Sequence, residues 1–241
     1  MTKTKYFLMF SGGKDSTAML FKCLENSEKY PIDEIIFYDT GFEFPYMYDY
    51  LDLIDKKLEK YGLKITRLGE GKKTWNKWSK GCFTRGKLNG KMRGFPITIG
   101  MSWCTREFKI CPFNKYIKTK HKKNNIIKYI GIASDEKKRI KKDKNIIYPL
   151  VDFNMTENDC LEYTKKIDVY NKLYDDFKRT GCYLCPKQNQ KSLKVLINKY
   201  PELWDNVKIM EKFFIKNDSA FSLFAIKGTA YFEKKLKEYD L

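Results

Sequence analysis

One short segment near the amino terminus, FLMFSGGKDSTAML (residues 7–20), constrains the fold more than any other part of the chain. An apolar run ends in two glycines, and a pattern typical of an amphipathic helix follows directly. Glycine lets a backbone turn tightly, and the free amide groups at a helix start form a cradle for anions. The hydroxyls of Ser11, Ser16 and Thr17 and the charge of Lys14 would add to such a cradle. The segment therefore predicts a buried strand, a phosphate-binding turn and a helix, with a glycine spacing that differs from a Walker A loop.

Strand and helix patterns alternate along the first part of the chain. Strands are predicted over residues 5–10, 34–39, 63–68 and 125–132, and helices over residues 16–29 and 46–61, the second ended by Gly62. Such alternation favours right-handed crossovers and a doubly wound, mainly parallel α/β sheet. Residues 69–101 are rich in Gly, Lys and Trp, show no clear periodicity, and are expected to form a long loop.

The last third of the chain has helical character. Thr156 is expected to cap a helix that runs to about Ile167, and helical patterns also cover residues 191–216 and 229–239. We therefore expect an α/β domain over residues 1–150 and a helical carboxy-terminal region over residues 151–241.

Composition and charge narrow the classes of protein that this chain can belong to. Its 241 residues are 42% hydrophobic and 16% aromatic, which suffices for a buried core. No apolar run approaches the length of a membrane span or of a secretory signal, so we expect a cytoplasmic protein without a membrane partner. The formal net charge of +18 favours an anionic partner such as nucleic acid or a polyphosphate, although a Lys-, Asn- and Ile-rich composition would also produce it.

Seven cysteines accompany a single histidine, which makes catalysis by Ser–His or Cys–His pairs a poor hypothesis. Clustered cysteines in a cytosolic chain indicate metal or redox chemistry rather than disulfides. Cys182 and Cys185 form a C-x-x-C pair before Pro186, and Cys104 and Cys111 lie in WCTREFKICP. Two separated pairs can make a four-thiolate site for an iron–sulfur cluster or for structural zinc.

The place of Cys111 in this site depends on the local backbone. If residues 104–111 form one helix, the two Cα atoms lie about 10 Å apart along its axis, which is long for one cluster. Pro112 disfavours helix at the preceding residue, so we expect a bend that brings the thiols closer. Otherwise the site would use three cysteines and an open iron, or would recruit Cys82 from the long loop.

The remaining cysteines and the tryptophans have simpler interpretations. Cys23 and Cys160 fall within predicted helices and are expected to be core thiols. The tryptophans could stack on nucleic-acid bases, but packing in the core is the expected role of each. They are Trp75, Trp78, Trp103 and Trp204.

Four segments together resemble a known family. SGGKDST (residues 11–17) looks like the PP-loop of the ATP pyrophosphatases and sulfonucleotide reductases. Three further segments are similar to the phosphoadenosine phosphosulfate (PAPS) reductase branch, and the four matches cover residues 5 to about 190. These three are FYDTGFEFP (37–45), YIGIASDEKKRI (129–140), and the stretch from YPLVDF (148–153) through NKLYDDFKRTGCYLCPKQ (171–188).

The resemblance implies an adenine nucleotide alpha hydrolase-like fold that binds ATP or a related adenosine nucleotide, with Mg²⁺ as a further candidate. It implies that Asp39 orients the nucleoside at the carboxyl end of the second strand. Lys14 and Arg139 inherit phosphate-binding and catalytic roles, although an arginine that the branch often carries near Ala133 is missing here. The phosphate-binding residues that it implies are Ser11, Gly12, Gly13, Lys14, Asp15, Ser16 and Thr17.

The same branch includes reductases whose [4Fe-4S] cluster is bound by two cysteine pairs. By this resemblance Cys104, Cys111, Cys182 and Cys185 would hold a [4Fe-4S] cluster, with zinc as the alternative. The leading hypothesis is an iron–sulfur-dependent nucleotide alpha hydrolase or sulfur transferase that releases pyrophosphate and has nucleic acid as a candidate substrate.

Two other functions stay open at this point: a sulfonucleotide (PAPS or adenosine phosphosulfate, APS) reductase, and a non-catalytic nucleic-acid-binding accessory protein. In the resembling reductases, a cysteine of a mobile carboxy-terminal tail attacks the sulfur of the bound nucleotide. Residues 186–241 contain no cysteine, so we expect this chain not to run that reaction. The sequence does not indicate an oligomeric state.

Overall fold

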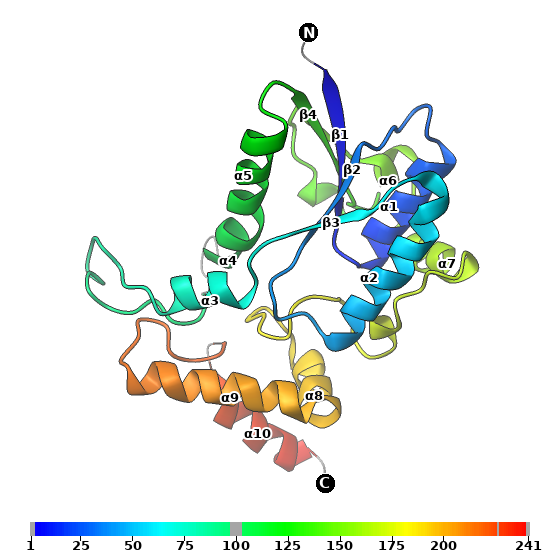
Figure 1. Cartoon of the computed structure of the whole chain (residues 1–241). Coiled ribbons are helices and arrows are strands. Elements are labelled where there is room, and N and C mark those ends of the chain that lie inside the picture. Colours follow the sequence, from blue (N-terminus) through cyan, green and yellow to red (C-terminus); the bar gives the residue numbers. More distant parts are fainter. Residues whose placement is uncertain (1–2, 97–102, 226, 240–241) are drawn as a thin grey trace. The chain divides into compact units, whose positions relative to one another are not determined.

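The computed structural model describes residues 3–96, 103–225 and 227–239 (Figure 1). The chain divides into two compact units whose segments alternate along the sequence. Unit 1 consists of Met1–Tyr38, Pro45–Leu68 and Phe113–Tyr174, and unit 2 consists of Asp39–Phe44, Gly69–Pro112 and Asp175–Leu241.

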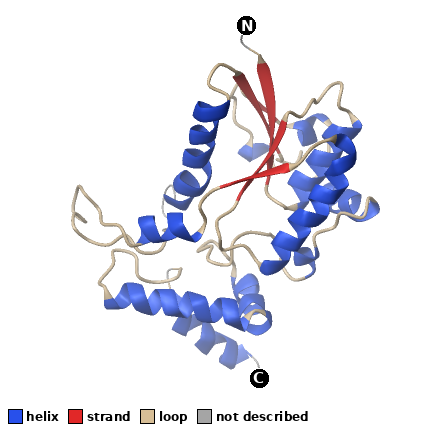
Figure 2. Ribbon diagram, in the orientation of Figure 1, coloured by secondary structure: helices blue, strands red, loops and turns tan. Residues whose placement is uncertain are grey.

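Unit 1 is built on a five-stranded sheet whose strand pairs are all parallel (Figure 2). The strand order is β3-β2-β1-β4-β5, so the order reverses between β1 and β4. Open α/β sheets bind their ligands at such a switch point, beside the carboxyl ends of the strands. The predicted α/β sheet is thereby confirmed. The strands are β1 (Thr4–Phe10), β2 (Glu34–Tyr38), β3 (Ile65–Leu68), β4 (Asn125–Ile130) and β5 (Ile146–Ile147).

Helices cover both faces of this sheet. On one face Phe7 of β1 and Ile36 of β2 form a buried cluster with Phe113 of α5 (Cys111–Lys120). On the other face lie α1 (Lys14–Glu25), α2 (Pro45–Leu58), α6 (Pro149–Asp152) and α7 (Glu157–Lys166), as Figures 1 and 2 show. Thr156 caps α7 in a capping box with Asp159, which confirms the predicted start of this helix.

Two more predicted boundaries can be compared with the structure. A 3₁₀ turn (Glu59–Tyr61) extends α2, and Gly62 ends it with a φ of 65°, as predicted. The helix predicted over residues 191–216 is interrupted, because Pro201 starts a new helix. A proline at a first helical position lacks only an N–H that would have no helical partner there.

Unit 2 is helical around an aromatic core. Phe95 contacts Trp75, Phe214 and Phe224, with ring centroids 5.1 to 5.9 Å apart. Buried Glu211 accepts hydrogen bonds from the backbone N–H groups of Phe224 and Thr229, and the second of these is a free amide at the start of α10. The helices are α3 (Lys72–Ser79), α4 (Trp103–Thr105), a π-helical segment (Arg106–Ile110), α8 (Gln190–Lys199), α9 (Pro201–Lys216) and α10 (Gly228–Tyr239).

Helix α3 corrects the expectation of a long loop over residues 69–101, of which 97–101 lie outside the described residues. Only Trp75 and Ser79 of this short helix are buried, so its apolar stripe is too brief to produce a periodic signal. The packing expected for Trp75 and Trp204 is confirmed, since both are nearly inaccessible to solvent. Among the described residues, no helix is both long enough and apolar enough to cross a bilayer.

Candidate functional site

The SGGKDST turn of unit 1 joins β1 to α1 at the switch point of the sheet. Gly12 has a φ of +72°, and a Cβ atom there would lie 2.4 Å from the sulfur of Met47, so this position requires glycine. The amide of Ser11 donates to Ser16 Oγ at 3.1 Å, and Ser16 Oγ donates to the carbonyl of Gly13 at 2.9 Å. The two serines therefore hold the shape of the turn.

Two side chains of a segment distant in sequence, residues 171–174, form hydrogen bonds with the same turn. The side-chain amide of Asn171, which is buried, donates to the carbonyl of Gly12 at 2.8 Å. The hydroxyl of Tyr174 accepts a hydrogen bond from the amide of Lys14 at 2.9 Å. Neither side chain was singled out from the sequence, although both lie in the NKLYDDF stretch that carries part of the resemblance.

Opposite charges gather at the start of α1. Lys14 Nζ lies 3.0 Å from Asp15 Oδ1 and 3.3 Å from Glu157 Oε1. Carboxylate oxygens of Asp15, Glu136 and Glu157 all lie within 4.8 Å of one another, and we call these three residues the carboxylate cluster. Burial opposes the charge of Lys14, but Asp15, Tyr174 and Glu157 together outweigh it and the pKa of Lys14 is raised. Burial also raises the pKa of Asp15, against the effect of Lys14.

Arg139 reaches the carboxylate cluster from the loop that follows β4. This loop passes close to α1, because a Cβ atom on Gly131 would lie 3.1 Å from the backbone of Ser16. Arg139 hydrogen-bonds to Glu136, which raises the pKa of the guanidinium, and Asp15 contributes to the same shift. The structure thus brings together Lys14 and Arg139, two residues that the sequence proposed separately.

Two other predicted site residues make local contacts. Thr17 Oγ1 is buried 2.9 Å from the hydroxyl of Tyr50, which in turn donates to the carbonyl of Val169 at 2.8 Å. Asp39, the first residue of unit 2, accepts a hydrogen bond from the amide of Gly41 at 2.7 Å. Thr17 therefore anchors α1 in the core, and Asp39 shapes the turn after β2.

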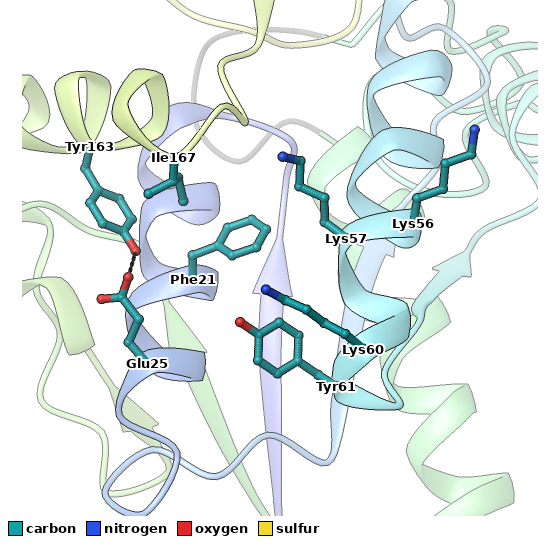
Figure 3. A pocket seen from close by; sticks show the side chains of 8 residues that line it. All are labelled: Phe21, Glu25, Lys56, Lys57, Lys60, Tyr61, Tyr163 and Ile167. Atoms are coloured by element: carbon teal, nitrogen blue, oxygen red, sulfur yellow. Dashed lines mark hydrogen bonds between the residues drawn. The ribbon is translucent and has the colours of Figure 1, made fainter.

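A separate cavity of about 360 Å³ lies beside the carboxyl end of α1 (Figure 3). Phe21 and Glu25 of α1 line it together with Lys60 and Tyr163, and the hydroxyl of Tyr163 donates to Glu25. Since a 12-residue helix is about 18 Å long, this cavity is distinct from the phosphate-binding turn at the other end of α1.

Three thiols of unit 2 interact electrostatically with one another, those of Cys104, Cys182 and Cys185. The amide of Cys185 donates to the carbonyl of Cys182 at 3.1 Å, which closes the C-x-x-C segment into a turn. The thiol of Cys182 donates a hydrogen bond to the sulfur of Cys185, so the pKa of Cys185 is lowered and that of Cys182 is raised. Burial raises the pKa of Cys104 in α4, and its interaction with Cys185 adds to this shift.

Two charged residues that interact electrostatically with these thiols, Glu43 and Lys109, were not found from the sequence. Glu43 lies in the electrostatic field of Cys182, and its carboxylate accepts a hydrogen bond from the hydroxyl of Thr40 at 2.7 Å. Burial raises the pKa of Glu43, whereas Lys109 opposes this shift. Glu43 belongs to FYDTGFEFP, where the predicted nucleoside contact drew attention to Asp39 instead.

The bend expected at Cys111 is wrong. Cys111 has helical dihedral angles, with a φ of −65° and a ψ of −47°, and the chain is helical from Trp103 to Lys120. The π-helical segment before Cys111 explains how Pro112 is accommodated. A π turn bonds residues five apart and is wider than an α turn, so it relieves the clash of the proline ring with the carbonyl of Phe108.

Three further cysteines differ from these thiols in their burial or their backbone contacts. Cys23 and Cys160 are fully buried, which confirms them as core thiols, and burial raises the pKa of Cys23 to about 12. Cys82 is exposed and forms a backbone bridge with Met92. The donor set of Cys104, Cys182 and Cys185 consists of soft sulfur ligands, which suit an iron–sulfur cluster or zinc.

Comparison with known proteins identifies the family. The profile of the phosphoadenosine phosphosulfate reductase domain matches residues 5–188. An uncharacterized protein of Methanocaldococcus jannaschii is 30% identical over 214 aligned positions, and the match covers 84% of this chain and 40% of that protein. The chain spans 40% to 58% of the length of the curated relatives that it matches.

Two solved structures are also similar. The phosphoadenylyl-sulfate (PAPS) reductase of Candida auris, in a phosphate complex, has a TM-score of 0.49 and 19% identity over 76% of this chain and 84% of that chain. The U34-tRNA thiolase NcsA of Methanococcus maripaludis, with its [4Fe-4S] cluster, has a TM-score of 0.45 and 16% identity over 88% of this chain and 73% of that chain. Because the domain profile matches well over half of its residues, the chain belongs to the phosphoadenosine phosphosulfate reductase domain family.

Proposed function

We propose that this chain is a PP-loop enzyme that binds ATP at the SGGKDST turn and cleaves it between the α- and β-phosphates. The observation that carries this proposal is the convergence of Lys14 and Arg139 on one carboxylate cluster. They come from the turns after β1 and β4, the two strands that flank the switch point of the sheet.

The charges of the site suit a magnesium–ATP complex. Lys14 and Arg139 are both paired with carboxylates in this structure. Mg²⁺ prefers oxygen ligands and usually binds through one or two carboxylates together with substrate phosphates. A cation held by the carboxylate cluster would release Lys14 and Arg139 to bind the phosphates. Both would then stabilise the negative charge that develops on the departing pyrophosphate.

The proposed reaction is sulfur transfer through an adenylylated substrate. A substrate oxygen attacks the α-phosphorus, the bond to the β-phosphate oxygen breaks, and pyrophosphate leaves with the electron pair. A sulfur donor then displaces AMP from the activated carbon. In this proposal Asp39 orients the nucleoside, whereas Thr17 and Asn171 position the turn. The net charge of +18 makes nucleic acid our candidate for the acceptor.

Cys104, Cys182 and Cys185 are the residues that would hold a [4Fe-4S] cluster with one iron open, because the helix from Trp103 to Lys120 separates Cys111 from Cys104 by about 10 Å along its axis. The cluster would supply an iron to which a sulfur donor can bind. Zinc bound by the same thiols is the alternative, and the metal content of anaerobically purified protein separates the two.

The proposed cleavage is tested with ATP labelled at the α-phosphate in one sample and at the γ-phosphate in another. We expect labelled AMP or an adenylylated acceptor in the first sample and labelled pyrophosphate in the second. Lys14→Ala should abolish both products, whereas Lys22→Ala, a change at the other end of α1, should not. ADP and inorganic phosphate as products would contradict the proposal.

A further inference from the structure

Residues 81–94, here called the basic finger, form a structured projection of unit 2. Cys82 and Met92 form an antiparallel bridge, and the amide of Phe83 donates to the carbonyl of Lys91 at 2.9 Å. Gly86 and Gly90, with φ values of 75° and 81°, make the turns at its tip. This hydrogen bonding gives the finger a defined shape although it contains no helix.

The base of the basic finger is fixed to the segment before α10. The amide of Ala220 donates to the carbonyl of Met92 at 2.7 Å, and that of Phe95 donates to the carbonyl of Phe221 at 2.7 Å. A Cβ atom on Gly94 would lie 2.2 Å from the carbonyl oxygen of Phe221, so the two backbones are in close contact. The finger therefore presents its side chains from an anchored support.

The charged side chains of the basic finger and of the residues just before it are all positive. Between Gly71 and Phe95 there are eight basic side chains and no Asp or Glu. Lys73 and Lys91 pair with Glu70 and Asp218, and none of the other six forms an ion pair with another described residue. The tip residues Arg85 and Lys87 are exposed. The eight basic residues are Lys72, Lys73, Lys77, Lys80, Arg85, Lys87, Lys91 and Arg93.

Aromatic rings accompany these charges. The guanidinium of Arg93 lies 4.8 Å from the ring centroid of Trp78 and 5.5 Å from that of Phe83. Both rings are half-buried. A guanidinium held on an aromatic face loses little freedom when it binds a phosphate, and a partly exposed ring can stack on a base. Trp78 is therefore only half-buried and is not enclosed in the core, where it was expected to pack.

We propose that the basic finger binds the phosphodiester backbone of a nucleic acid. The regularly spaced phosphates of a nucleic acid can pair with the cations of the anchored finger that form no ion pair with other described residues. Its bases can stack on the neighbouring aromatic rings. An acidic protein would satisfy the charges but would leave the ring faces without a stacking partner. The binding of nucleic acid does not depend on the proposed function. Only the further statement that this nucleic acid accepts sulfur rests on it.

The test compares two double variants by fluorescence anisotropy with a labelled 20-nucleotide single strand of RNA, the same sequence as DNA, and the two duplexes. Arg85→Gln/Lys87→Gln removes two charges from the tip of the finger. Lys122→Gln/Lys123→Gln removes two exposed charges from unit 1 and is the matched control. All four side chains are exposed, and equal melting temperatures will show that both variants fold.

We expect the finger variant to bind the single strands roughly 25-fold more weakly than wild-type protein at 0.1 M salt. Each lost phosphate contact reduces the slope of log affinity against log salt concentration by about 0.7, and two lost contacts give this factor at 0.1 M relative to 1 M salt. The control should change affinity by less than about threefold. Tighter binding of RNA or of DNA identifies the natural polymer, and equal binding of both indicates recognition of the backbone alone.

Three results would overturn the binding surface: equal losses in the two variants, no binding by wild-type protein at low salt, or competition by polyglutamate as strong as that by unlabelled RNA. The last would assign the finger to an acidic protein partner. Pyrophosphate release is measured separately on wild-type protein. Its absence, with finger-dependent binding intact, would refute the proposed function and leave the binding surface standing.

Discussion

The side-chain amide of Asn171 donates a hydrogen bond to the backbone carbonyl of Gly12 at 2.8 Å. The oxygen of the same side chain accepts a hydrogen bond from the amide of Leu173 at 3.0 Å. One buried asparagine thus joins the phosphate-binding turn to the segment after α7, and its bond to the carbonyl of Gly12 helps to hold this glycine in its left-handed conformation.

Asn171→Ala should lower the free energy of unfolding by about 2 to 3 kcal/mol, because it leaves a buried carbonyl and a buried amide without partners. It should also weaken ATP binding, since the turn loses its support. Urea denaturation and calorimetry check the two effects. Asn114→Ala, an exposed change in α5, is the control and should shift stability by at most about 0.5 kcal/mol. Equal stability of Asn171→Ala and wild type would refute this role.

Lys14→Ala should weaken ATP binding by about 1.5 to 3 kcal/mol, the scale of a lost charge-assisted hydrogen bond. The partner charges at Asp15 and Glu157 would also be left without their ammonium group. Isothermal titration calorimetry measures the difference, with Lys22→Ala in the last turn of α1 as the control. If Lys14→Ala binds ATP as tightly as wild type, Lys14 does not contact the nucleotide.

Anaerobically purified protein should be brown and contain about four irons per chain. Cys104→Ser, Cys182→Ser and Cys185→Ser should each remove most of the iron, because these interacting thiols of unit 2 are the proposed ligands. Cys82→Ser, at an exposed position, is the matched control and should keep it. Iron analysis of Cys111→Ser decides between three and four ligands. Stoichiometric zinc without iron would exclude the cluster.

In the reduced, metal-free protein, Cys185 should still react with an alkylating reagent at a pH at which an ordinary thiol no longer does. The hydrogen bond from Cys182 holds the pKa of Cys185 below its usual value of 9.0, so its reactive thiolate persists as pH falls. The stabilisation that this thiolate gives the fold is complete above the unfolded-state pKa and is lost as pH falls through the lower, folded-state pKa. Cys182→Ala should move the midpoint upward. Iodoacetamide labelling read by mass spectrometry measures it, and an unchanged midpoint would argue against the hydrogen bond.

The chain should bind the adenosine moiety of PAPS or APS but release no sulfite with thioredoxin. Residues 186–241 offer no cysteine that could form the thiosulfonate intermediate, and Cys185 itself belongs to the thiol site. A sulfite assay with a true reductase as positive control is decisive. Sulfite at a normal reductase rate would overturn this reading, and its loss in Cys82→Ser with iron retained would identify Cys82 as a relocated nucleophile.

The local parts of this protein follow from its sequence alone. A strand, a turn with Gly12 at positive φ and the helix after it depend on residues that are neighbours in the chain, and so do the cap at Thr156 and the stop at Gly62. The sequence missed α3, where two buried residues give too short a pattern. It also misjudged Cys111, because the effect of Pro112 was considered without the π turn that accommodates it.

Only the tertiary structure decided which distant residues meet. The strand order places β4 beside β1, and this brings Arg139 to the charges around Lys14. Asn171 reaches Gly12 across a separation of 159 residues, and Glu43 comes to interact electrostatically with Cys182 in the same way. Such contacts depend on the order of strands and the packing of helices, which are properties of the whole fold and leave no periodic or spacing signal in either segment.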